Sequence, residues 1–146
     1  MLANDALLAL VGGLVAPRLL EPPVNVLRTS LHPDGLAHHI VNLDEYAAHT
    51  VGRLRRQVEI TGDQVLAELL DELTSYPHVP LATPHDHDIG VVLPLRIRRG
   101  GDELALFTTI ATFGAPLDVT LSELAIEAFY PADGRTADLL HGRTGA

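Results

Sequence analysis

The spacing of the apolar residues changes once along this chain, and that change restricts the fold more than any other feature. Up to residue 76 the apolar residues recur at every third or fourth position, which is typical of helices with one buried face. Beyond residue 88 they alternate with other residues, which is typical of strands. The pattern predicts a single α+β domain over residues 1–146, an antiparallel sheet with helices packed on one face. Its expected parts are a helical half over 1–76, a loop over 77–88, a sheet over 89–131 and a terminal helix over 133–141.

The helical half is expected to contain two long helices and two short ones. The longest begins after Asn42, which forms with Glu45 the sequence pattern of a capping box. A Thr-Gly-Asp turn at 61–63 closes it, and Asp63 is expected to cap the next helix. Short helices are expected over 4–10 and 24–31, with another turn or two over 14–20. The apolar stripe of the longest helix comprises Leu43, Tyr46, Ala47, Thr50, Leu54 and Val58, and that of the next comprises Val65, Leu66, Leu69, Leu70 and Leu73.

A pair of glycines, Gly100-Gly101, stands between two stretches of alternating residues and predicts a tight hairpin turn. The first of these strands is expected over 91–97. The return strand over 104–113 has apolar residues on both faces, which is typical of a central strand. A third strand is expected over 124–130, and Asp133 is expected to cap the final helix.

The composition excludes several classes of function. The formal net charge is −9, so the chain alone is not expected to bind DNA. The absence of cysteine excludes disulfides, thiolate metal sites and cysteine nucleophiles. Because no G-x-S-x-G elbow, P-loop or G-x-G-x-x-G motif is present, we interpret the chain as non-enzymatic and expect no cofactor. The broken apolar run over 2–15 fits neither a membrane span nor a signal peptide, so a cytoplasmic location is expected.

The histidines support a rival hypothesis of metal binding. His85-Asp86-His87-Asp88 is a dense group of candidate zinc or nickel ligands, and His78 lies shortly before it. Neighbouring side chains of a loop point apart, so this tetrapeptide would rarely supply more than two of the four ligands that zinc takes. A solvated loop is therefore the favoured interpretation of these residues.

Several stretches of the chain resemble one known family. They include Pro94 to Arg98, Glu103 to Thr109 and Glu123 to Glu127, and the most specific is the run Thr-Phe-Gly-Ala-Pro-Leu-Asp-Val-Thr at 112–120. Together they are similar to the ligand-binding domain of the MmyB-like transcription regulators. The resemblance implies a PAS-like fold that follows an XRE-type helix-turn-helix domain, which this chain lacks. It also implies a pocket for a fatty acid or a similar small apolar molecule. The family often carries Trp where this chain has Leu43.

Apolar side chains that lie between the sheet and the helices are the candidates for such a pocket, although an ordinary core role is the favoured interpretation of each one taken singly. Arg28 is the candidate for a carboxylate head group because a guanidinium fork matches a carboxylate, and Asn25 could assist it. The alternative is that Arg28 is an ordinary surface arginine of its helix. Thr108 and Thr112 could donate hydrogen bonds from a strand, or could reflect β-propensity alone. The apolar candidates are Leu27, Leu31, Tyr46, Leu66, Leu69, Leu95, Phe107, Phe113, Ile126 and Phe129.

A third hypothesis is that the domain serves mainly as a dimerisation module. A homodimer would pair two linked helix-turn-helix domains, and DNA would be contacted only through them. An enclosed apolar cavity favours sensing, whereas a filled core with a large apolar outer patch favours assembly. For sensing, the expected mechanism is a population shift, in which the ligand prefers one packing of the helices.

Overall fold

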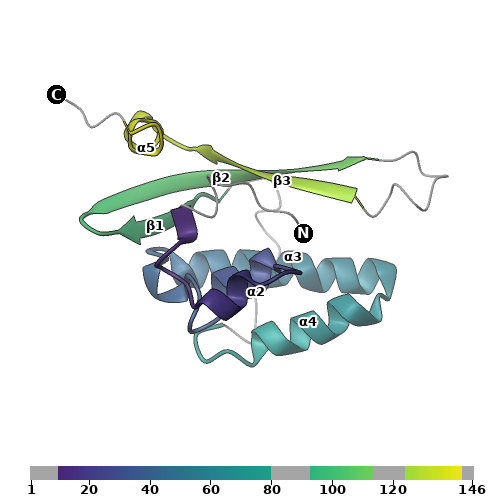
Figure 1. Cartoon of the computed structure of the whole chain (residues 1–146). Coiled ribbons are helices and arrows are strands. Elements are labelled where there is room, and N and C mark those ends of the chain that lie inside the picture. Colours follow the sequence, from purple (N-terminus) through teal and green to yellow (C-terminus); the bar gives the residue numbers. More distant parts are fainter. Residues whose placement is uncertain (1–9, 80–92, 114–123, 143–146) are drawn as a thin grey trace.

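The computed structural model describes residues 10–79, 93–113 and 124–142, and it shows an α+β fold with a three-stranded antiparallel sheet (Figure 1). In chain order the helical elements are η1 (Pro17–Leu20), α2 (Val26–Leu31), η2 (Ala37–His39), α3 (Leu43–Thr61), α4 (Gln64–Thr74) and α5 (Gly134–Leu140). The strands are β1 (Leu95–Arg99), β2 (Asp102–Phe113) and β3 (Leu124–Pro131). The predicted helix over 4–10 lies almost wholly outside the described residues.

The sheet has the strand order β1-β2-β3, so the prediction that the return strand is central is confirmed. The predicted hairpin is confirmed as well: Arg99 pairs with Asp102, and Gly100-Gly101 makes the turn between them. Gly100 has a φ of 60°, which a residue without a Cβ adopts at little cost. On the other side, β2 pairs with β3 from Leu106↔Pro131 to Phe113↔Leu124.

Helix α3 begins beside the sheet, and Asn42 makes the connection. The predicted capping box is wrong, because the Asn42 side chain makes no hydrogen bond to the first turn of α3. Its Nδ2 instead donates to the carbonyl oxygen of Pro94 at 2.8 Å, and its Oδ1 accepts from the backbone N–H of Arg96 at 3.1 Å. The backbone N–H of Val41 also donates to the carbonyl of Arg96. The side-chain amide of Asn42 thus connects the start of α3 to β1 and the residue before it, and makes no cap for the helix.

Two residues determine where α4 begins and how the chain turns after α2. Asp63 caps α4, since its Oδ1 accepts from the backbone N–H groups of Val65 and Leu66 at 2.8 and 3.2 Å. After α2 the chain turns back closely at Gly35, which is buried. A Cβ at this position would overlap the carbonyl oxygen of Thr29, so only glycine fits.

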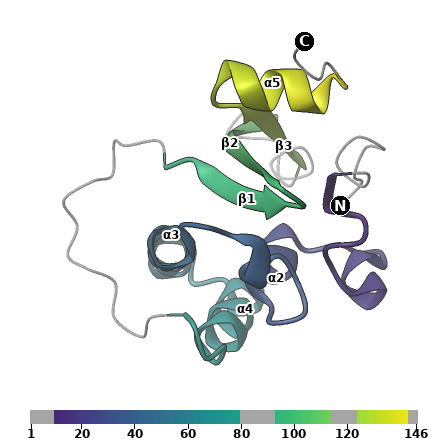
Figure 2. The same ribbon diagram turned by 90° about the vertical axis from the view of Figure 1, so that its left-hand side faces the viewer.

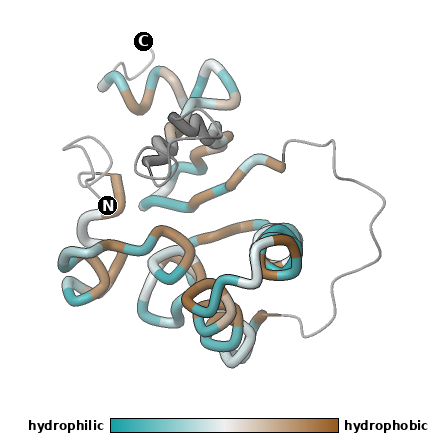
Figure 3. Tube along the Cα trace, turned by 90° about the vertical axis from the view of Figure 1, so that its right-hand side faces the viewer, coloured by the Kyte–Doolittle hydropathy of each residue, from teal (hydrophilic) through white to brown (hydrophobic). Residues whose placement is uncertain are grey.

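The apolar interior consists of two clusters that meet at α3. Leu43 and Tyr46 of α3 pack against both clusters, so this helix joins the helical layer to the sheet (Figure 2). Hydrophobic and hydrophilic residues are interspersed along the helices of the helical layer, as one buried face requires (Figure 3). The sheet cluster is formed by the buried residues Leu10, Val11, Val15, Leu36, Ile40, Leu95, Ile97, Leu104 and Leu106. The helix cluster is formed by Leu31, Ala47, Val51, Leu54, Leu69, Leu73 and Val79.

Helix α5 departs from the predicted arrangement of helices on one face. Helices α2, α3 and α4 share one side of the sheet, whereas α5 lies on the side away from them (Figures 1 and 2). Asp133 caps α5 as predicted, accepting from the N–H of Thr136 at 2.7 Å. Thr136 is fully buried, and its Oγ1 accepts from the backbone N–H of Ala105 at 2.9 Å. Beyond the last β3 pair, α5 therefore supplies the hydrogen bond that a strand would otherwise make to β2.

Candidate functional site

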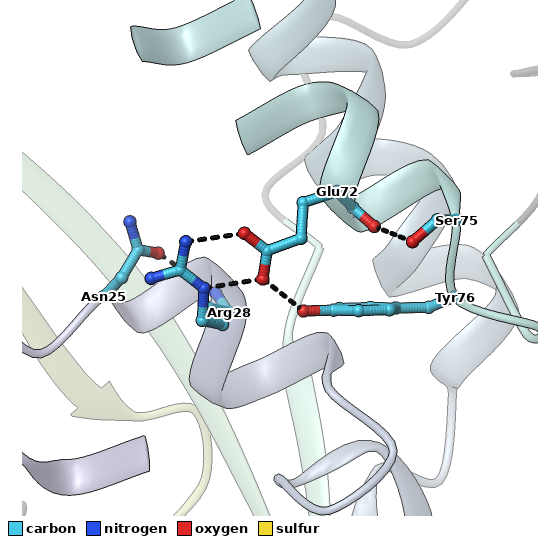
Figure 4. A network of polar contacts seen from close by, with 5 residues as sticks. All are labelled: Asn25, Arg28, Glu72, Ser75 and Tyr76. Carbon is cyan, nitrogen blue, oxygen red and sulfur yellow. Dashed lines mark hydrogen bonds and ion pairs between the residues drawn. The ribbon is translucent and has the colours of Figure 1, made fainter. Parts of the chain in front are cut away.

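A polar network joins α2 to the last turn of α4 (Figure 4). Arg28 donates from Nε to Oε1 of Glu72 and from Nη2 to Oε2 of Glu72, each at 2.6 Å. The hydroxyl of Tyr76 donates to the same Oε1 at 2.7 Å. Three donors therefore converge on one carboxylate, and the guanidinium meets it in the forked geometry that arginine forms with carboxylates.

The local backbone positions each member of this network. Asn25 caps α2, because its Oδ1 accepts from the backbone N–H of Arg28 at 3.0 Å. This cap sets the first turn of α2, from which the Arg28 side chain extends to α4. Glu72 lies in the last turn of α4 and Tyr76 follows just beyond the end of this helix, where its hydroxyl reaches the Glu72 carboxylate.

The charges of the network reinforce one another. The hydrogen bond from Arg28 is the main reason that the pKa of Glu72 lies below its ordinary value, and the same bond raises the pKa of Arg28. Burial, followed by the hydrogen bond to Glu72, raises the pKa of Tyr76. At neutral pH the network therefore holds a guanidinium, a carboxylate and a neutral phenol. The side chains of Arg28 and Glu72 are 40% and 35% exposed, so water reaches this ion pair.

Aromatic rings extend the network toward the end of α2. The ring of His32 lies edge-on to Tyr76 with centroids 5.2 Å apart, and the ring of His78 is 6.4 Å from Tyr76. Nε2 of His78 lies 2.7 Å from the carbonyl oxygen of Leu31 and donates to it, since a carbonyl only accepts. The segment that follows α4 is therefore tied to α2 at several points.

Seven of the ten predicted apolar site residues belong to the two clusters of the interior. Four contribute to the helix cluster, two contribute to the sheet cluster, and Tyr46 packs against both. The structure thus brings together the candidates of each group, and Tyr46 is the candidate that connects them. The helix group is Leu27, Leu31, Leu66 and Leu69, and the sheet group is Leu95 and Phe129.

Phe107 does not join these residues, contrary to the expectation that it faces the helices. Its neighbour Leu106 is buried in the sheet cluster, and successive side chains of a strand point to opposite faces. Phe107 therefore lies on the other face of the sheet, where it stacks on Tyr130 with centroids 5.4 Å apart. The expectation failed because it placed Leu95 and Phe107 on one face, although Leu95 pairs with Leu106.

The other strand candidates are located by their backbone pairing. Thr108 pairs with Phe129, and its side chain is half-buried. Thr112, Phe113 and Ile126 pair with Ala125, Leu124 and Ala111 respectively, and their side chains lie outside the described part of the structure.

The sequence pointed to Arg28 and Asn25 as candidates but not to Glu72 and Tyr76, which join Arg28 in the fold. A signal existed in their spacing of four, which places an acid and a phenol side by side. Nothing in the sequence indicated that Arg28, 44 positions earlier, would meet them.

Metal binding and membrane crossing are two further properties that the described residues bear on. Among the described residues, no three His, Asp or Glu side chains gather in a way that could hold a metal ion. The run from His85 to Asp88 lies outside those residues, so the hypothesis for this loop stays a prediction. None of the helices that the structure describes is long and apolar enough to cross a membrane.

Fold and site together define an α+β domain in which a helical layer covers one face of a three-stranded antiparallel sheet. The sequence model of the MmyB-like transcription regulator ligand binding domain matches residues 1–141. The chain belongs to this family, as its resemblance predicted, and is a ligand-binding domain of the kind found in transcription regulators. No curated protein and no solved structure matches the chain.

Proposed function

We propose that this domain senses a small apolar molecule with an anionic end, such as a fatty acid, and thereby controls a linked helix-turn-helix domain. The observation that carries the proposal is the position of α3 between the two apolar clusters. A ligand that inserts beside Leu43 or Tyr46 changes how α3 packs on the sheet or on α4. Family membership supports a regulatory role for that change.

The effect on DNA binding would be a shift in population between two packings of the helices. A ligand changes this equilibrium only to the extent that its affinity differs between the two packings. The domain itself needs no catalytic group for this role. With a net charge of −9 it would contact DNA only through the helix-turn-helix domain, in the cytoplasm where bacterial DNA lies.

Arg28 is the proposed partner of the anionic end of the ligand. Its Nε and Nη2 already present the fork that a carboxylate accepts. Apolar side chains on the same two helices, Leu27 on α2 with Leu66 and Leu70 on α4, are partly buried against the helix cluster. A molecule with a carboxylate and a short alkyl chain fits this combination of a cation and an apolar surface.

A dimerisation role is the second candidate, and an exposed aromatic residue on the sheet face away from α3, the face that also carries α5, favours it. On this face Phe107 stacks on Tyr130, whose side chain is exposed. Aromatic residues are enriched in protein–protein interfaces, and a symmetric pair of such faces would form a homodimer.

Native mass spectrometry of the purified chain, followed by denaturing extraction, tests the two candidates. A co-purifying lipid or aromatic acid, or a mass shift after incubation with a panel of fatty acids, supports sensing. Dimers that carry no ligand, and whose mass does not change with the panel, contradict sensing and support assembly. Tyr130→Ser is the matched variant, because it would weaken the dimer and leave ligand binding intact.

A further inference from the structure

The carboxylate of Glu72 sits where three donors converge, and the proposed ligand carries the same chemical group. We propose that Glu72 occupies the head-group position of a carboxylate ligand, so that ligand binding and the α2–α4 ion pair exclude one another. This inference rests on the proposed sensing function and adds to it a competitor built into the chain. It also identifies the contact that the ligand breaks.

The geometry around Glu72 is that of a carboxylate site. Both of its oxygens are engaged by Arg28, at 2.6 Å each, and Oε1 also accepts from Tyr76 at 2.7 Å. A free carboxylate of the same shape would make all three hydrogen bonds without change of geometry. The planar fork of arginine recognises this shape, which an alcohol or an amide does not reproduce.

The pair is accessible enough to exchange. Its side chains are 40% and 35% exposed, and solvent-exposed ion pairs open at low cost because water solvates the separated charges. When the ligand carboxylate replaces that of Glu72, Arg28 still has an anionic partner. The released Glu72 would turn toward water beside Asp71 and Glu68, which are exposed on the same helix.

Binding of the ligand would change the contact between α2 and α4. Arg28 and Glu72 make the charged contact between α2 and α4, and a ligand carboxylate would end it by binding to α2 alone. Helix α4 would then be held by the helix cluster, which α3 shares. The ligand would thus loosen one side of α4 while its alkyl chain packs against Leu27 and Leu66. This coupling is reciprocal: weakening the ion pair must strengthen ligand binding.

The experiment measures binding of decanoic acid to the full chain by titration calorimetry, with decan-1-ol as the probe that lacks a carboxylate. Glu72→Gln is expected to lower the Kd for decanoate about fivefold, the gain when a partly exposed ion pair no longer competes with the ligand. Glu68→Gln removes the same charge one turn earlier and is expected to leave the Kd unchanged. Arg28→Gln is expected to weaken decanoate binding and to leave decanol binding unaffected.

Carboxyl NMR of the wild-type chain gives a readout that does not depend on any variant folding. Added decanoate is expected to shift the side-chain carboxyl signal of Glu72, while the signal of Glu68 stays in place. If decanoate binds with the help of Arg28 but Glu72→Gln does not tighten it and the Glu72 signal is unmoved, the competition is overturned and sensing stands. If neither the wild type nor Glu72→Gln binds decanoate, the competition and the proposed carboxylate ligand fail together.

Discussion

Arg28 and Glu72 meet through two parallel hydrogen bonds of 2.6 Å, although 44 positions separate them in the chain. The pair connects a helix of six residues to one of eleven. Helices as short as α2 are marginal on their own, so tertiary contacts of this kind decide whether they form.

The first prediction concerns the energy of this pair. Arg28→Gln and Glu72→Gln should each lower the free energy of unfolding, and the double variant should cost less than their sum. Because water reaches both side chains, we expect a coupling of about 1 kcal/mol. Urea denaturation of the four proteins measures it. Additive effects would show that the ion pair contributes nothing to the fold.

The second prediction concerns acid stability. The pKa of Glu72 is lower in the folded chain than its ordinary value of 4.5, so the folded state binds this proton less tightly than the unfolded state. The stabilisation is therefore complete above about pH 4.5 and is lost as the pH falls through the lowered pKa.

Urea denaturation between pH 7 and pH 3 checks this, with Glu72→Gln as the reference. Asp34 and Asp133 also have lowered pKa values, through Arg18 and through the backbone of Thr136, and they contribute equally to both proteins. The difference between the two proteins should shrink as the pH falls. Parallel curves would contradict the assignment to Glu72.

The third prediction concerns Asn42. Asn42→Ala should destabilise the domain by about 1–2 kcal/mol, because two hydrogen bonds between the start of α3 and β1 are lost. Asn42→Ser separates this role from helix capping, since serine is a good N-cap but cannot replace both bonds. Thermal denaturation should show that serine restores little of the loss. Full recovery with serine would mean that Asn42 acts as a cap after all.

The fourth prediction concerns Gly35. Gly35→Ala should destabilise the domain by roughly 2 kcal/mol, because a Cβ there overlaps the carbonyl oxygen of Thr29. Gly101→Ala is the matched control: its Cβ would meet no atom within 4 Å. This control should be close to neutral in urea denaturation. Equal losses in both variants would contradict the close approach at Gly35 as the cause, because the reduced backbone entropy of the unfolded chain by itself stabilises an alanine variant.

Features that depend on neighbouring residues were predictable from the sequence. Asp63 and Asp133 cap their helices as expected, and the paired glycines make the hairpin turn, because each involves atoms only a few residues apart. Family membership was likewise predictable, because it depends on runs of residues such as 112–120.

Features that depend on distant partners were not predictable. Asn42 has the sequence pattern of a cap, yet its amide bonds to residues 52 and 54 positions away. Arg28 was recognised as a carboxylate binder, but the carboxylate that it binds in the fold belongs to Glu72. The alternation of residues showed that Phe107 and Leu106 lie on opposite faces of their strand, but not which face the helices cover. That is determined by packing, and the covered face is that of Leu106.

The three tyrosines of this chain lie in three different parts of the fold, and the chain contains no tryptophan. Tyr46 packs between the two clusters, Tyr76 bonds to Glu72, and Tyr130 stacks on Phe107 at the outer face of the sheet. The near-ultraviolet spectrum of the domain is therefore a sum of three local signals without a dominant chromophore. Replacing any two tyrosines by phenylalanine leaves one tyrosine, whose signal reports on one part of the fold. Opening of the helical layer can then be followed separately from changes in the sheet.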